Sequence, residues 1–66
     1  MHKEEMSFLK EHVGKRVVVV YLENGEERSV VGVLHNANDN FVAVTADNGS
    51  IHAIRASDVR KVKIKP

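Results

Sequence analysis

The side chains that could catalyse a reaction or bind a metal are few in this sequence and lie far apart in it. The four histidines are His2, His12, His35 and His52, and there is no cysteine. A catalytic zinc usually has three protein ligands, so His35 and His52 would make an incomplete site even if their strands met. HExxH, GxSxG, GxGxxG and Walker-type glycine loops do not occur. We therefore predict a protein that is not an enzyme, with no catalytic residue, metal or cofactor.

The charged side chains are distributed unevenly along the chain. Residues 1–50 carry five lysines and arginines against eight aspartates and glutamates, whereas residues 51–66 carry five against one. A basic segment on a slightly acidic body indicates a polyanionic partner or an acidic neighbouring subunit. The other interpretation is that Lys61, Lys63 and Lys65 form the solvated face of an edge strand, where lysines deter aggregation.

The length of 66 residues limits the chain to one domain, residues 1–66. A domain of this size buries only about 60% of its unfolded surface, so association with further copies would add stability. No apolar run reaches the roughly 20 residues of a membrane helix, and residues 1–7 are too charged for a signal peptide. These features predict a cytoplasmic protein without membrane association.

A short helix is predicted at the start of the chain. Met6, Leu9 and Val13 recur at helical spacing, and Gly14 follows them as a helix-terminating glycine. We expect a helix over residues 3–13 that lies across one end of the remaining structure.

Five short antiparallel strands are predicted after the helix. Asn24-Gly25 is a strong hairpin signal, although the two glutamates that follow allow a longer turn. Residues 56–58 form a brief turn, predicted as 3₁₀. Gly32 has apolar neighbours on both sides, and a glycine inside a strand indicates a sharp bend, which would let the sheet curl into a small barrel. The predicted strands are residues 16–23, 28–36, 41–46, 50–55 and 59–65.

Three segments resemble the Sm-like (LSm and Hfq-like) superfamily of small β-barrels. Residues 21–25, Tyr-Leu-Glu-Asn-Gly, resemble the strand and turn of the bacterial Hfq-type proteins. Residues 31–34, Val-Gly-Val-Leu, resemble the Gly-x-Leu core of the first Sm motif, and residues 54–59, Ile-Arg-Ala-Ser-Asp-Val, resemble the second. The resemblance spans roughly residues 8–65. It implies a mostly β fold, an Sm-like or SH3-like five-stranded antiparallel barrel with a short N-terminal helix.

The resemblance also implies a function, which is RNA binding by a homo-oligomeric ring. In the family, the fourth strand of one subunit pairs with the fifth strand of the next. Here that would be residues 50–55 against residues 59–65. Both segments would leave unpaired backbone groups at a sheet edge, which suits such pairing.

The RNA-binding residues implied by the resemblance come from two places. In the loop of the first motif, Asp39 or Asn38 would take the place of the family's aspartate, with Asn40 beside it. In the second motif, Arg55 would contact single-stranded RNA, because a guanidinium can stack on a base and hydrogen-bond to it. Lys61 and Lys63 would add attraction to phosphates without sequence preference.

Two observations favour a different role for these residues. Arg55 could instead form a surface salt bridge to Asp58 or Glu27. The three aromatic residues all suit the core, so no surface on which bases could stack is predicted. They are Phe8, Tyr21 and Phe41.

A second resemblance is to the C-terminal barrel of the ribosome maturation factor RimP and, more distantly, to the SH3-like domain at the end of biotin protein ligases. Residues 13–17, Val-Gly-Lys-Arg-Val, and residues 58–62, Asp-Val-Arg-Lys-Val, are similar to it. It implies the alternative function, a non-enzymatic protein-interaction or ribosome-associated module without a direct RNA site.

Overall fold

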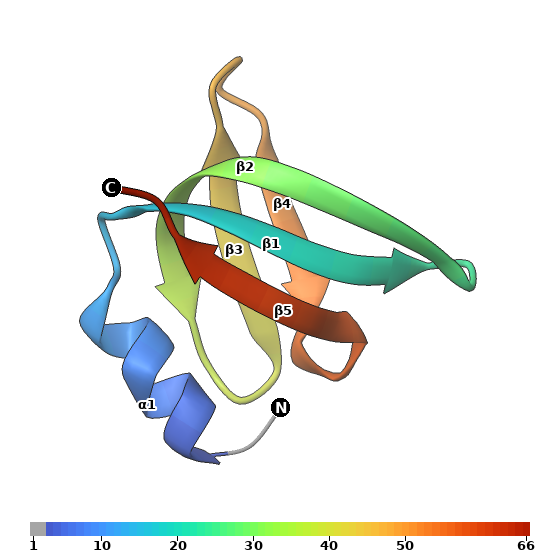
Figure 1. The fold of residues 1–66 in the computed structure, drawn as a ribbon, viewed down its shortest axis with the longest axis horizontal. Helices are drawn as coiled ribbons and strands as arrows, with labels where there is room; N and C mark the ends of the chain where they lie inside the picture. The colour runs from blue at the N-terminus through green and yellow to red at the C-terminus, as the bar shows by residue number, and fades with distance from the viewer. Residues whose placement is uncertain (1–2) are drawn as a thin grey trace.

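One short helix and one five-stranded sheet make up the structure (Figure 1), a computed structural model that describes residues 3–66. His2 lies outside the described residues. Among residues 3–66, no helix is long and apolar enough to cross a membrane. In chain order the elements are α1 (Lys3–Glu11), β1 (Arg16–Glu23), β2 (Glu26–Ala37), β3 (Phe41–Ala46), β4 (Ile51–Arg55), the 3₁₀ turn η1 (Ala56–Asp58) and β5 (Val59–Ile64).

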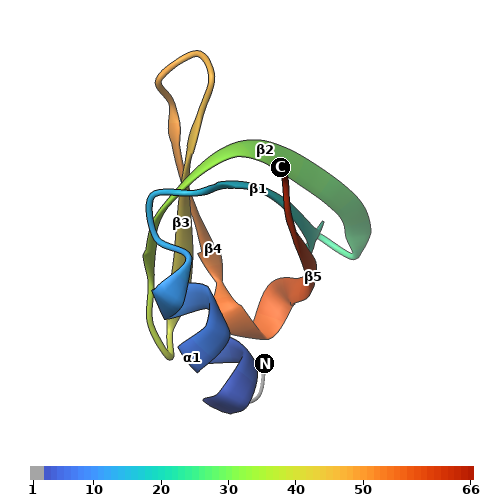
Figure 2. The same cartoon turned by 60° about the vertical axis from the view of Figure 1, so that its left-hand side comes forward.

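The sheet has the order β4-β3-β2-β1-β5, and every neighbouring pair is antiparallel. The longest strand, β2, pairs with both β1 and β3, and Figure 2 shows it arching from one to the other. The predicted antiparallel, mostly β fold with an N-terminal helix is confirmed. The sheet is not closed within residues 3–66. After the turn at η1, β5 pairs with β1 and not with β4, so β4 and β5 form the two ends of the sheet.

Gly32 lies where β2 turns from one partner strand to the other. It is buried, and it stands opposite Val17 of β1 and Ala46 of β3. A Cβ added to Gly32 would lie 2.9 Å from the Ala46 Cα and closer still to the carbonyl group of Thr45. Glycine is therefore required here because the backbone of β3 occupies the space of a side chain.

The core fills the inside of the bent sheet. Strand alternation points every second side chain inward, and α1 adds Met6 and Leu9, which are both buried. The helix thereby covers apolar surface that the sheet alone would leave open. The largest fully buried side chains are Val17, Val19, Leu34, Val42 and Val44.

The helix is shorter than predicted, since α1 ends at Glu11 and not at residue 13. The chain then turns toward the sheet, where the Gly14 N–H donates to the Leu34 carbonyl oxygen at 2.8 Å. This bond to β2 holds the segment after the helix in a non-helical path. Val13, predicted on the apolar face of the helix, consequently lies outside it and is 46% exposed.

The first hairpin has the tightest of the predicted turns. Asn24 and Gly25 both have positive φ values, 52° and 79°, as a two-residue turn of type I′ requires. The two glutamates that follow therefore belong to β2, which begins at Glu26, two residues before its predicted start. The limits of the other strands agree with the prediction to within one residue, and η1 occupies residues 56–58 as expected.

One ion pair joins the start of β1 to the β3–β4 turn, which is distant from it in the sequence. The guanidinium of Arg16, at the start of β1, donates two hydrogen bonds to the Asp47 carboxylate, at 2.9 and 2.8 Å. These bonds and the positive charge lower the pKa of Asp47 below its usual value, and the same contacts raise the pKa of Arg16. The pair connects the β3–β4 turn to β1.

Asp47→Asn should lower the melting temperature at neutral pH by only a few degrees, because the pair is exposed to solvent. The pKa of Asp47 is lower in the folded than in the unfolded state, so the ion pair stabilises the folded state fully at pH values above the unfolded-state pKa. This stabilisation is lost as the pH falls through the folded pKa. Thermal unfolding followed by circular dichroism should give the wild-type chain and Asp47→Asn the same melting temperature in strong acid. A difference that persists there, or an Arg16→Ala/Asp47→Asn double variant with fully additive losses, would contradict the pairing.

Candidate functional site

The turn between β2 and β3 lies beside the end of β4, and this brings together four of the six residues predicted to bind RNA, Asn38, Asp39, Asn40 and Arg55. Phe41, the first residue of β3, is the cross-strand partner of Arg55, the last residue of β4. The Ala56 N–H donates to the Asn40 carbonyl oxygen at 2.8 Å, which ties the turn to the chain after β4. Arg55 and residues 38–40 therefore share one end of the sheet.

The backbone of this turn is held by Asn38. Its Oδ1 accepts hydrogen bonds from the N–H groups of Asn40 and Phe41, both at 2.8 Å. An Asn side chain commonly stabilises a turn in this way. The side-chain oxygen of Asn38 is thus occupied by the turn, whereas Asp39 is exposed and forms no hydrogen bond or ion pair within residues 3–66. Asn38 has a structural role, and Asp39 and Asn40 carry the exposed polar groups.

Arg55 takes part in a surface ion pair, one of the two roles considered for it. Its Nε donates to Asp58 Oδ2 at 3.1 Å, while its side chain is 72% exposed. The partner is Asp58 and not Glu27. An exposed pair of this kind is weak, and it uses only one edge of the guanidinium. The other N–H groups of Arg55 donate to no protein group within residues 3–66.

Phe41 is an exposed aromatic residue at the centre of this site, and its predicted place in the core is wrong. Its side chain is 47% exposed, because Val42 and Val44 point inward from β3 and Phe41 alternates with them. Phe8 is also exposed, at 49%, whereas Tyr21 packs against the core. The alternation of β3 separates Phe41 from Val42 and Val44 already in the sequence, but it does not specify which of the two faces is buried. Phe41 and Arg55 are cross-strand partners, so an exposed aromatic side chain and an exposed guanidinium extend from the same side of neighbouring strands.

Lys61 and Lys63 lie elsewhere on the molecule. They are exposed on β5, opposite Val20 and Val18 of β1. In the described part of the chain, no hydrogen bond, ion pair or strand pairing links them to Arg55 or to residues 38–40. The structure therefore does not place these two lysines in the same site as Arg55 and residues 38–40.

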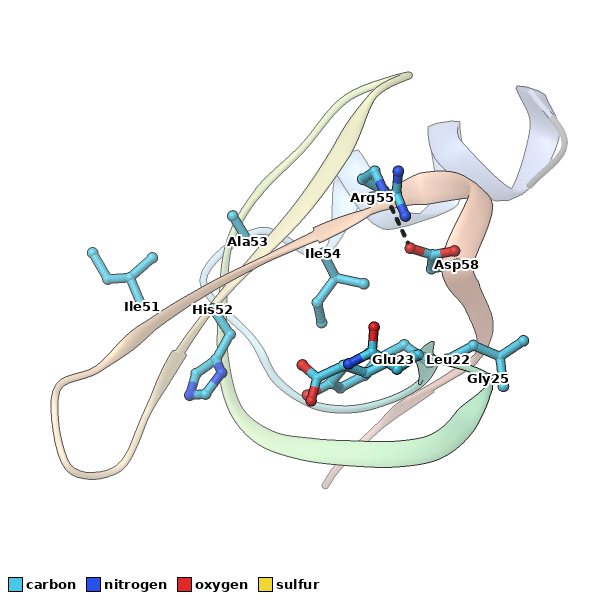
Figure 3. Close-up of a pocket in the computed structure, with 11 residues that line it drawn as sticks. Leu22, Glu23, Gly25, Ile51, His52, Ala53, Ile54, Arg55 and Asp58 are labelled. Carbon is cyan, nitrogen blue, oxygen red and sulfur yellow. Dashed lines mark hydrogen bonds and ion pairs between the residues drawn. The ribbon is translucent and has the colours of Figure 1, made fainter.

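A cleft of about 660 Å³ opens between β4 and the tip of the β1–β2 hairpin. Figure 3 shows His52 and Ile54 pointing from β4 into this cleft, with Arg55 and Asp58 at one end. The histidine pair considered for a metal does not form, because β3 lies between β2, which carries His35, and β4, which carries His52. Across residues 3–66, no three His, Asp or Glu side chains come together as metal ligands. The polar and charged side chains that line the cleft include His52, Glu23, Arg55 and Asp58.

Comparison with known proteins provides no family for this chain. No protein-family model matches the sequence, and no curated protein matches it either. The function must therefore be argued from the site itself.

Proposed function

We propose that this chain is an RNA-binding Sm-like protein that works as a homo-oligomeric ring in the cytoplasm. The observation that carries the proposal is the pairing of Arg55 with the exposed Phe41, beside the polar turn 38–40. Single-stranded RNA is recognised largely by bases that stack on aromatic or guanidinium planes and hydrogen-bond along their edges. This end of the sheet offers both kinds of group on neighbouring strands.

Each part of the site has a distinct role in this proposal. The Phe41 ring supports a stacked base, and the free N–H groups of Arg55 donate to the same base or to its phosphate. Asp39 and Asn40 hydrogen-bond to the base edge from the turn. Lys61 and Lys63 raise the association rate through their positive charge.

The open sheet supports the ring. The Ala56 N–H donates to the Asn40 carbonyl oxygen, and the Ser50 carbonyl oxygen accepts from the Ala46 N–H, so the backbone groups of residues 50 and 56 point toward β3. Because the backbone groups of successive residues point to opposite sides of a strand, those of Ala53 point away from β3, to the free edge of β4. On β5, Lys65 bonds to Arg16 of β1, so the backbone of Val62 points to the other free edge. These two edges can pair between subunits, β4 of one with β5 of the next.

Arg55→Ala should weaken binding of a fluorescein-labelled oligouridine by about tenfold, measured by fluorescence anisotropy at low salt. Phe41→Ser should have an effect of similar size, because the stacked base loses its support. Arg28→Ala is the matched control, since Arg28 is also an exposed arginine in an ion pair, with Glu26 at 3.1 Å. Equal losses for Arg55→Ala and Arg28→Ala would remove Arg55 from the site. A wild-type protein that does not bind oligouridine even at low salt would favour the protein-interaction module instead.

A further inference from the structure

The convex face of the sheet carries an apolar surface made by β1 and β2. Its side chains alternate with the buried Val17, Val19 and Val30, so they point away from the core. All five are partly exposed, and Val33 is 41% exposed. We call this the outer valine face, and its members are Val18, Val20, Leu22, Val31 and Val33.

A row of lysines borders the outer valine face on one side. Lys61 stands opposite Val20 and Lys63 opposite Val18, so these lysines lie on the same side of the sheet as the valines. Lys65 continues the row, with its N–H bonded to the Arg16 carbonyl oxygen at 2.8 Å. The surface therefore combines the aliphatic side chains of β1, and of β2 at Val31 and Val33, with one strand of positive charge. Farther along β2 the same side carries Ser29 opposite Val20 and Glu27 opposite Leu22, so the negative charge on this face lies on the side away from β5.

Nothing in residues 3–66 covers this surface. Of the strands, β2 has the most contacts with α1, whose Met6 and Leu9 belong to the core, and α1 also lines a groove together with residues 59–62 of β5. Figure 2 shows α1 below the arch of β1 and β2, away from its convex side. A strand with four consecutive valines is typical of sheets that are covered on both faces. Here the core covers the inner face of β1, whereas its outer face stays partly exposed within residues 3–66.

A second copy of the chain is a poor cover for this face. If two such faces packed about a twofold axis parallel to the strands, the lysines of β5 would lie on the valines of β2. If the axis were perpendicular to the strands, lysines would face lysines. Either arrangement buries uncompensated charge. Nucleic acid is disfavoured too, because no aromatic side chain belongs to the outer valine face.

We propose that the outer valine face binds an amphipathic α-helix of another protein, with acidic residues along one flank. Two strands are about 10 Å across, which matches the width of one helix. From Val18 to Leu22 the face is about 13 Å long, equal to about nine helical residues. A helix lying along β1 would place its apolar stripe on the valines and its acidic flank on Lys61 and Lys63. The free edges of β4 and β5 are not used, so this binding does not depend on the proposed function.

The test uses two synthetic 18-residue helical peptides and the ¹⁵N-labelled full chain. Both peptides have a leucine stripe, and one flank carries glutamates in the first and lysines in the second. The glutamate peptide should shift the amide resonances of Val18, Val20 and Val31, and the lysine peptide should bind at least about tenfold more weakly. Lys61→Glu/Lys63→Glu should reverse this preference. The control is Lys10→Glu/Lys15→Glu, which makes the same charge change on exposed residues outside the face.

Three results would overturn the inference. The first is a glutamate peptide that does not bind the wild-type chain, or that binds Lys61→Glu/Lys63→Glu and the control Lys10→Glu/Lys15→Glu with equal affinity. The second is oligouridine that shifts the same amides at lower concentration than the peptide, since that would make the face a nucleic-acid surface. The third is a shift of these amides with protein concentration alone, since that would assign the face to a second copy.

Discussion

Gly32→Val should abolish cooperative folding. The added side chain would meet the carbonyl group of Thr45 and the Ala46 Cα, which are backbone atoms and cannot rotate away. Either β3 separates from β2 or the bend opens, and both changes disrupt the core around Leu34. We expect a loss of about 3 kcal/mol or more, because backbone must move as well as side chains. A chain of this length has only about 3–10 kcal/mol of stability in total.

The experiment compares thermal and urea unfolding of three variants by circular dichroism. Gly32→Ala should already be destabilised, since its Cβ makes the same contacts, and Gly32→Val should have no unfolding transition. Ser29→Val is the matched control, because it introduces valine at an exposed position of the same strand. Wild-type stability of Gly32→Val would show that β2 does not need glycine at its bend.

Ala53→Pro should dissociate the proposed ring into folded monomers. Ala53 is exposed, and its N–H points away from β3, so proline removes no hydrogen bond within the subunit. Between subunits, the same change deletes a donor at the centre of β4 and places the proline ring against β5 of the neighbour.

Mass measurement in solution decides this second prediction. The wild-type chain should have six or seven times the 7.4 kDa mass of the monomer, as the Sm-like resemblance implies. Ala53→Pro should have the monomer mass with an unchanged circular dichroism spectrum. Ala53→Ser keeps the N–H and should remain assembled. A wild-type chain that is monomeric at micromolar concentration would refute the ring, and an assembled Ala53→Pro would show that β4 is not its interface.

Local signals in the sequence were sufficient to predict most of the secondary structure. The turn at Asn24-Gly25 follows from two residues that tolerate positive φ, and the valine-rich β1 follows from β propensity. The bend at Gly32 was predicted from one glycine between apolar neighbours. The end of α1 was not predictable in this way, because it is set by a hydrogen bond from Gly14 to the distant Leu34.

At the candidate site, the features that local sequence predicts differ clearly from those that depend on the three-dimensional structure. Residue types and their spacing were sufficient to predict which strands alternate and where the chain turns, since these features depend on neighbours a few positions apart. The tertiary structure alone decided that Phe41 faces solvent beside Arg55, that β3 separates His35 from His52, and that β4 and β5 end the sheet. Alternation divides a strand into two faces without specifying which is buried. That choice depends on pairing between distant strands, which the packing of the whole core selects.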